Sequence, residues 1–472
     1  MPSMMLRFCL YGFLKNQRYF EPFLFLAFLE KGLGFTQIGL LIAVREVTTG
    51  LLEIPSGAIA DVFGRRLSMI ASFVAYIAAF VLFGFADAMP LLVGGMLLYG
   101  VGEAFRSGTH KALIFAWLRR QGREHERVKV YGHTRSWSKF GSAASVLLAA
   151  PIVILSRSYE WIFFAAIPPY ALNVINFLGY PKELDESNGQ ERSVREVLRH
   201  TLRAVSESVK KPKLRRLFAE SMGFDGVFAA VKDYLQPVLE ALALGLTAAW
   251  VSTGIDGASS ASPGAAGAPS SAPAFFSWTD PASWSDVQRG ALLVGPVYFA
   301  LHMLSGVASR RSHQVSDAAG GEERASRWLW CVNIAVFAAL TLGGVANWMV
   351  LMAMAFVALH VLENVWRPVL ISRFDVHGSK AQGASLMSIE SQARRVATMV
   401  VAPVLGWAVD AVAGGGVIGS ETGHAQSVVG EAAPVPTWGT ASPLWPVGAV
   451  GLASAVCFWF GTRRVSRPSS AV

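Results

Sequence analysis

Ionisable side chains stand inside the long apolar stretches of this 472-residue chain, where they are costly. On insertion scales a charged residue at the centre of a membrane-spanning helix costs roughly 2.5–3.5 kcal/mol, so such a residue marks a functional position by default. The candidates are Lys15, Arg18, Glu21, Glu103, Arg106, Arg135, Asp225, Lys232, Asp233, Glu363, Arg367, Glu390 and Arg394. We expect them to face a polar interior rather than lipid.

Some of these residues are spaced so that they could form ion pairs on one helix face. The predicted pairs are Glu103 with Arg106, Glu363 with Arg367, and Glu390 with Arg394. Pairs that break and reform could accompany a change of conformation, and a released carboxylate could take up a proton. Two alternatives stay open: a pair could be a neutralised structural bridge, and Lys15 could extend to the membrane interface.

A second charged group is the segment GAIADVFGRR at residues 57–66. We expect Gly57 to allow close helix packing and Gly64 to adopt a positive φ. Asp61 is suited to accept hydrogen bonds from a helix N-terminus. Arg65 and Arg66 can donate to carboxylates, to helix-end carbonyls of another part of the chain, or to lipid phosphate. The segment is therefore a candidate conformational latch, although a plain basic hairpin would also explain its arginines.

A weaker second copy of this segment is predicted at Gly306, Ser309, Arg310 and Arg311. There serine replaces the aspartate and the second glycine is missing. We expect an asymmetric latch in which the first copy dominates.

The apolar stretches themselves define the class of protein. Hydrophobic residues make up 53% of the chain and charged residues only 15%, against about 25% in soluble domains. About twelve stretches approach the roughly 20 residues that a spanning helix needs. They lie near 6–30, 36–59, 67–87, 90–117, 131–155, 160–180, 214–249, 286–308, 328–347, 348–372, 384–411 and 442–461. The sequence therefore predicts an all-α polytopic membrane protein.

Basic residues are concentrated in alternate loops, including Arg119–Arg127, the segment 181–213 and the C-terminal tail. The segments 250–285 and 412–441 contain no Lys or Arg. The positive-inside rule then places both termini in the cytoplasm. We expect the protein to lie in the cytoplasmic (inner) membrane. The net charge of +9 follows from this topology, and its dispersal argues against nucleic-acid binding. Three cysteines in apolar stretches indicate neither a disulfide framework nor a metal site.

Short patterns recur in the same order in both parts of the chain. Tyr19–Pro22 matches Tyr234–Pro237, and Gly132 with Ala150-Pro151 matches Gly383 with Ala402-Pro403. We therefore expect two pseudo-symmetric six-helix bundles, residues 1–180 and 214–472. Residues 181–213 would form a cytoplasmic linker with an amphipathic helix, and residues 250–285 and 412–441 two flexible outer loops.

The pattern Gly57-x-x-x-Asp61-x-x-Gly64-Arg65-Arg66 between the second and third spans resembles the signature loop of the major facilitator superfamily. The twelve spans, the repeat and the central linker extend this resemblance over most of the chain. It implies a cavity lined by spans one, four, seven and ten, and a latch that closes the cytoplasmic side. The fifth span lacks the Gly-rich, Pro-containing motif of drug exporters, and Arg106 follows Gly100-x-Gly102 instead of preceding it. Both departures argue against multidrug export.

The expected function is secondary active transport of a small solute, coupled to protons because carboxylates are available and no nucleotide-binding loop is present. The excess of cavity arginine and lysine favours an anionic substrate, while import and export stay open. The alternative is a receptor or scaffold of the same fold without transport. No enzyme motif is found, so no catalytic residue or cofactor is predicted. The expected partners are the solute, protons and the lipid bilayer, and the chain is expected to be a monomer.

Overall fold

The computed structural model describes residues 2–107, 109–185, 210–258, 284–377, 383–414 and 442–465. The described residues form helices and no strand. The helices of the first half are α1 (Pro2–Leu14), α2 (Leu24–Glu30), α3 (Phe35–Phe63), α4 (Arg65–Phe85), α5 (Met89–Arg106), α6 (Thr109–Arg120), α7 (Arg127–Ser156) and α8 (Trp161–Leu178). Those of the second half are α10 (Pro212–Ser221), α11 (Val227–Val231), α12 (Leu235–Ala258), α13 (Asp286–Ala318), α14 (Glu322–Val345), α15 (Met349–His377), α16 (Gly383–Ala413) and α17 (Trp445–Val465).

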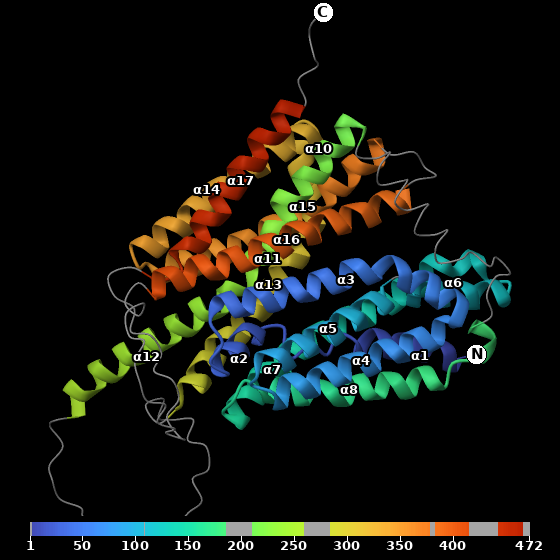
Figure 1. Ribbon diagram of the computed structural model, residues 1–472, viewed down its shortest axis with the longest axis horizontal. Helices are drawn as coiled ribbons and strands as arrows, with labels where there is room; N and C mark the ends of the chain where they lie inside the picture. The colour runs from blue at the N-terminus through green and yellow to red at the C-terminus, as the bar shows by residue number, and fades with distance from the viewer. Residues whose placement is uncertain are drawn as a thin grey trace, which may run out of the picture.

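The helices form two bundles, one from each half of the sequence (Figure 1). Helices α3 and α16 run side by side along the boundary, and α7 packs against α13. The bundles approach each other near α2, α12 and α13, and they diverge toward the ends that carry α6 and α10 (Figure 1). We call the end with the arginine-rich turn around Arg119 and Arg123 the basic end. The other end, where α3 begins and α16 finishes, is the opposite end.

By length and composition, eight of the described helices could cross a membrane, and the apolar helices Met4–Leu14 and Trp445–Gly461 are shorter. The fourth and seventh expected spans are broken. The fourth divides into α5 and α6 near Ser107. The seventh changes to a π-helix at Met222–Gly226 and to a 3-10 turn at Lys232–Tyr234 before α12 begins. With these segments, the described residues trace twelve spans of an all-α polytopic protein.

The first expected span is also discontinuous, since α1 ends at Leu14 and α2 begins only at Leu24. A gap in a membrane helix requires new partners for its backbone carbonyls. Asn16 donates to the Gly12 carbonyl at 3.1 Å and to the Ser138 carbonyl of α7 at 2.7 Å. Gln17 bridges α1 and α7 in the same way through the carbonyls of Phe13 and Gly141. Two side-chain amides therefore stabilise the break and fix it against α7.

Part of the predicted domain organisation lies outside the described residues. This applies to 186–209 of the linker and to 259–283 and 415–441 of the predicted outer loops. The linker helix, the two loops and the bundle bounds stay predictions.

Candidate functional site

The broken first and seventh spans meet where the halves of the protein touch. Gln236, which is fully buried, donates to the Glu21 carbonyl at 3.1 Å and accepts from the Phe25 backbone N–H at 2.8 Å. Glu21 and Gln236 hold equivalent positions in the predicted repeats Tyr19–Pro22 and Tyr234–Pro237. The repeat copies thus contact each other across the boundary between the halves.

In the N-terminal half, the predicted pair of Glu103 and Arg106 is present and is joined by Tyr76. Arg106 donates to one oxygen of Glu103, and the Tyr76 hydroxyl donates to the other at 2.6 Å. The Arg106 Nε also donates to the Tyr76 hydroxyl at 3.2 Å. Both carboxylate oxygens are therefore bonded, which favours a fixed anion at Glu103 over a group that exchanges protons.

Replacing Tyr76 with phenylalanine should lower the free energy of unfolding by about 1–3 kcal/mol, because one oxygen of a part-buried carboxylate loses its donor. Thermal unfolding of the purified protein would measure this loss. Tyr234→Phe is the matched control, since the buried Tyr234 hydroxyl has no hydrogen-bond partner among the described residues. Equal unfolding temperatures for the two variants would contradict the assigned role of Tyr76.

In the C-terminal half, a different set of pairs replaces the two predicted ones. Arg367 donates to Asp225 at 2.7 Å and to both oxygens of Glu390, at 2.6 and 2.8 Å. The Ser221 hydroxyl also donates to Glu390, at 2.5 Å. The predicted pairing of Glu363 with Arg367 and of Glu390 with Arg394 is therefore wrong. Arg367 reaches across to the carboxylates of two neighbouring spans instead of staying on its own helix face.

The remaining predicted residues have more varied surroundings. Lys232 and its neighbour Asp233 form an ion pair at 2.5 Å in the 3-10 turn. Within the described part of the chain, no side-chain hydrogen bond or ion pair is formed by Glu363, Arg394 or Glu21. The Arg18 Nε is buried in the break of the first span without a hydrogen-bond partner among the described residues. Lys15 and Arg135 line one cavity.

A polar network between α3 and α16 was missed by the sequence reasoning. Arg395 of α16 pairs with Glu46 of α3 at 2.7 Å and lies 3.5 Å from Glu53. Gln392 donates to Glu53 at 2.9 Å, and Arg45 pairs with Glu46 at 2.8 Å. The signal was available, because these α3 residues are charges within an expected span. The network connects the halves near the middle of both helices.

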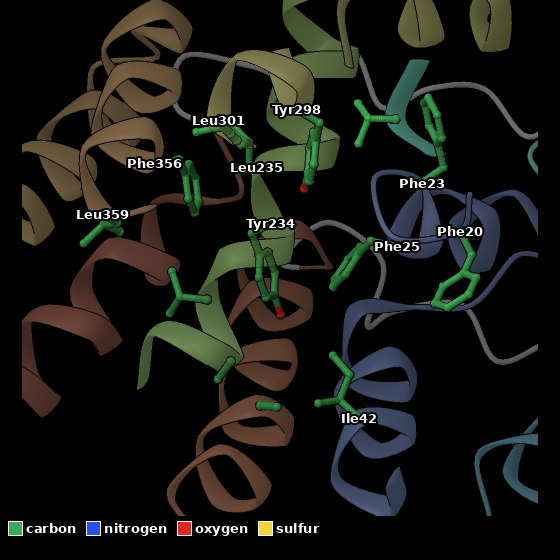
Figure 2. Close-up of a cluster of buried hydrophobic side chains, with 14 of the residues drawn as sticks. Phe20, Phe23, Phe25, Ile42, Tyr234, Leu235, Tyr298, Leu301, Phe356 and Leu359 are labelled. Carbon is green, nitrogen blue, oxygen red and sulfur yellow. The ribbon is translucent and has the colours of Figure 1, made fainter. Parts of the chain in front are cut away.

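The opposite end is closed by contacts between the halves. The Asp410 carboxylate of α16 accepts from the backbone N–H groups of Phe35 and Thr36 at 3.0 and 2.7 Å, and from the Thr36 hydroxyl at 2.5 Å. It thereby caps the N-terminus of α3, whose own cap residue is a glycine. Beside it, Phe25 and Tyr234 lie next to each other from opposite halves, with ring centroids 4.8 Å apart (Figure 2).

The GAIADVFGRR segment comprises the end of α3, Gly64 between the helices, and the start of α4 at the basic end. Gly64 has the expected positive φ, 99°. The prediction for Gly57 is wrong in this conformation, because a Cβ at that position would meet no atom of the described residues within 4 Å. Arg66 donates to the Leu178 carbonyl of α8 at 3.4 Å, a helix end of its own half. The Asp61 side chain lies outside the described residues, so its role as a latch stays a prediction.

The second copy of the latch was predicted at the wrong place. Arg310 and Arg311 lie on exposed turns of α13, which continues to Ala318 rather than ending near residue 308. The turn that corresponds to Gly64 holds Gly320 and Gly321, both with positive φ. Asp317 precedes Gly320 by the spacing that separates Asp61 from Gly64. The apolar count alone could not show how far α13 continues past its apolar part.

After this second turn the charges are inverted relative to the first. Where α4 begins with Arg65 and Arg66, α14 begins with Glu322 and Glu323. Glu323 accepts from the buried Arg373 at 3.0 Å, and Arg373 also donates to Glu220 at 2.5 Å. Acidic residues suit a helix N-terminus. This network joins α10, α14 and α15 at the basic end of the second half.

These features define a class of protein: a polytopic membrane protein of two pseudo-symmetric six-helix bundles with broken spans at their boundary. The sequence profile of the Major Facilitator Superfamily matches residues 6–389, and the chain belongs to this superfamily. It is a multi-pass membrane protein.

Individual relatives are distant. The uncharacterized MFS-type transporter YxaM of Bacillus subtilis (strain 168) is 31% identical over 101 residues, which are 21% of this chain and 24% of that protein. The chain therefore matches about a quarter of that relative's length.

Solved structures show the same fold over nearly the whole chain. The nucleoside transporter NupG has a TM-score of 0.63 at 12% identity and covers 99% of this chain and 98% of its own. A POT family transporter in complex with 5-aminolevulinic acid has a TM-score of 0.61 at 11% identity, with coverage of 98% and 96%. The D-xylose-proton symporter has a TM-score of 0.54 at 13% identity, with coverage of 97% for both chains. Identities this low show a shared fold alone.

Proposed function

We propose that this protein is a proton-coupled secondary transporter that moves a small solute by alternating access. The solute site would lie between the broken first and seventh spans, where Gln236 joins the repeat copies. Charged residues from both halves surround this position. Rocking of the halves would break the contacts of Asp410 and form new ones at the basic end.

One observation carries the proposal of proton coupling: Glu363 has no ion-pair partner among the described residues, while Asp225 and Glu390 share Arg367. Arg394 lies within electrostatic reach of all three carboxylates, and Lys232 is already bonded to Asp233. Three carboxylates therefore face two guanidinium groups. A proton on Glu363 would neutralise the remaining negative charge, which is costly inside a membrane.

The protein would lie in the inner membrane of a prokaryotic cell, with its basic end facing the cytoplasm. Both termini would then be cytoplasmic. The structure is then closed toward the outside by Asp410 and its neighbours. We further propose that the monomer is the working unit and that the latch around Asp61 closes the cytoplasmic side in the other conformation.

The function can be tested in proteoliposomes with an imposed pH gradient and a trapped pH-sensitive dye. A panel of acidic, neutral and basic solutes would be added one at a time, with protein-free liposomes as the control. At least one solute should cause proton movement that depends on the protein. Uptake of a solute at the same rate with and without the gradient would rule out proton coupling.

Replacing Glu363 with glutamine should make uptake insensitive to the pH gradient while solute exchange at equal pH continues, because the glutamine imitates the protonated carboxyl. Glu103→Gln is the matched control, since both Glu103 oxygens are already bonded. Comparing uptake rates over a range of gradients measures the effect. If the gradient dependence is lost in Glu103→Gln and kept in Glu363→Gln, the proton is carried by Glu103 and not by Glu363.

Replacing Asp61 with asparagine should reduce transport at least about tenfold while membrane insertion continues. The substitution removes a charge worth roughly 1.4 kcal/mol or more if it anchors a helix N-terminus in the closed cytoplasmic state. Asp375→Asn, on the exposed end of α15, makes the same chemical change elsewhere. Normal transport by the Asp61 variant would reject the latch.

A further inference from the structure

A cavity of about 290 Å³ opens inside the N-terminal half, between the end of α1, the start of α6 and the first half of α7. Its lining includes Lys15, His110, Arg135 and Lys139, and it contains no carboxylate. Lys139 lies about 18 Å along α7 from Arg127, at 1.5 Å per residue, so it is not a loop charge at the membrane surface. Several cations therefore meet inside the N-terminal bundle, within spans that are expected to cross the membrane.

These cations differ from most others inside the protein, because the described residues place no carboxylate within ion-pair distance of them. Arg106, Arg367 and Arg395 each bond to a carboxylate. Lys15 instead lies over the ring of Tyr11, with its Nζ 5.3 Å from the centroid. Positive charges that share a cavity repel one another, and each is costly inside a membrane. A bound anion would remove both penalties.

His110 gives independent support for a ligand. The residue is 8% exposed, and its Nε2 is buried without a hydrogen-bond partner among the described residues. Buried polar atoms normally have a partner, so an orphaned nitrogen in a cavity wall indicates a missing group. The ring stacks on Tyr11 with centroids 3.7 Å apart, which fixes its position. The stacked pair also offers a flat apolar surface beside the cations.

We propose that this cavity binds the acidic group of a small organic anion, a carboxylate or a phosphate ester. Arg135, Lys15 and Lys139 contact the acidic group, Arg135 being suited to bidentate bonding. The Nε2 of His110 forms the remaining hydrogen bond. The volume is at the lower end of the range for small-molecule pockets, so the anion is compact. This inference rests on the proposed transport function, and it assigns the acidic part of the substrate to the N-terminal half, beside the break in the first span.

Binding can be measured with the full-length protein in phosphatidylcholine nanodiscs, using pairs of anionic and neutral probes of similar shape. Benzoate with benzamide, and glycerol 3-phosphate with glycerol, are suitable, and thermal stabilisation gives the Kd. The anion of at least one pair should bind with a Kd below about 1 mM, while its neutral partner does not. If no anion stabilises the protein, the inference is wrong.

Variants locate the site. Lys15→Gln and Arg135→Gln should each weaken the Kd of the bound anion by roughly tenfold to a hundredfold, the value of a charge-assisted hydrogen bond. His110→Phe keeps the ring stack and should weaken it several-fold. Lys129→Gln, on an exposed position of α7 outside the cavity, should bind as the wild type does. Wild-type Kd values in all three cavity variants would overturn the assignment.

Two further results separate the alternatives. Repeating the titration in nanodiscs with phosphatidylglycerol tests whether lipid headgroups occupy the cavity, and a several-fold weaker anion affinity there would overturn the assignment to a solute. Anion binding that the cavity variants abolish, without any gradient-driven uptake, would support the site and contradict the transport proposal. Gradient-driven uptake of a neutral solute without anion binding would support the transport proposal and contradict the anion site.

Discussion

Replacing Arg367 with glutamine is expected to abolish gradient-driven uptake and to lower the free energy of unfolding by about 3–5 kcal/mol. Arg367 is the shared partner of Asp225 and Glu390, whose side chains are 1% and 2% exposed. Removing one member of a buried ion pair leaves an uncompensated charge, which is among the largest effects of a single substitution. Here two carboxylates would lose their partner together. Uptake in proteoliposomes and thermal unfolding measure the two effects.

A double variant separates stability from transport. Adding Glu390→Gln to Arg367→Gln removes one of the two orphaned charges, so part of the lost stability should return, while uptake stays absent. Arg310→Gln, on an exposed turn of α13, is the control for loss of a single arginine. Uptake near the wild-type rate in Arg367→Gln would show that the cluster is a structural bridge without a role in transport.

The sequence predicts those features of the site that depend on one helix or on composition. The apolar stretches give the spans, and Glu103 and Arg106 pair as expected because both lie on α5. The pairing of Arg367 was wrong because spacing along a chain reveals only neighbours on the same helix. The true partners are Asp225 of the π-helix and Glu390 of α16, and their proximity arises from packing between spans.

The break in the first span and the closure of the opposite end could not be predicted from the sequence, for related reasons. Pro22 and the polar residues before it are compatible with either a continuous or a broken span, because membrane helices tolerate both. The break is stabilised by Asn16 and Gln17, whose side-chain amides donate to carbonyls of α7, a helix distant in sequence. The role of Asp410 could not be predicted either, because its partners on α3 belong to the other half of the protein.

The close contact of α3 and α16 leads to the second large prediction. Gly39 of α3 lies so near α16 that a Cβ there would be 2.8 Å from the Ala402 carbonyl carbon and 2.9 Å from the Pro403 Cα. These are backbone atoms, which cannot move aside as a flexible side chain could. Gly39→Val should therefore prevent the opposite end from closing, at a cost of about 1–3 kcal/mol for overpacking. The conformational equilibrium would shift by roughly fivefold to a hundredfold.

The shift can be measured by the labelling rate of a cysteine at Leu33, which is buried at the opposite end, in a variant without the three native cysteines. A membrane-impermeant maleimide added from that side should react about tenfold faster in Gly39→Val, and uptake should fall accordingly because alternating access needs both closed states. Gly306→Val on α13 is the control, since a Cβ there meets no atom of the described residues within 4 Å. Unchanged labelling in Gly39→Val would mean that α3 and α16 do not have to meet for this end to close. Faster labelling with normal uptake would instead place the rate-limiting step of transport elsewhere in the cycle.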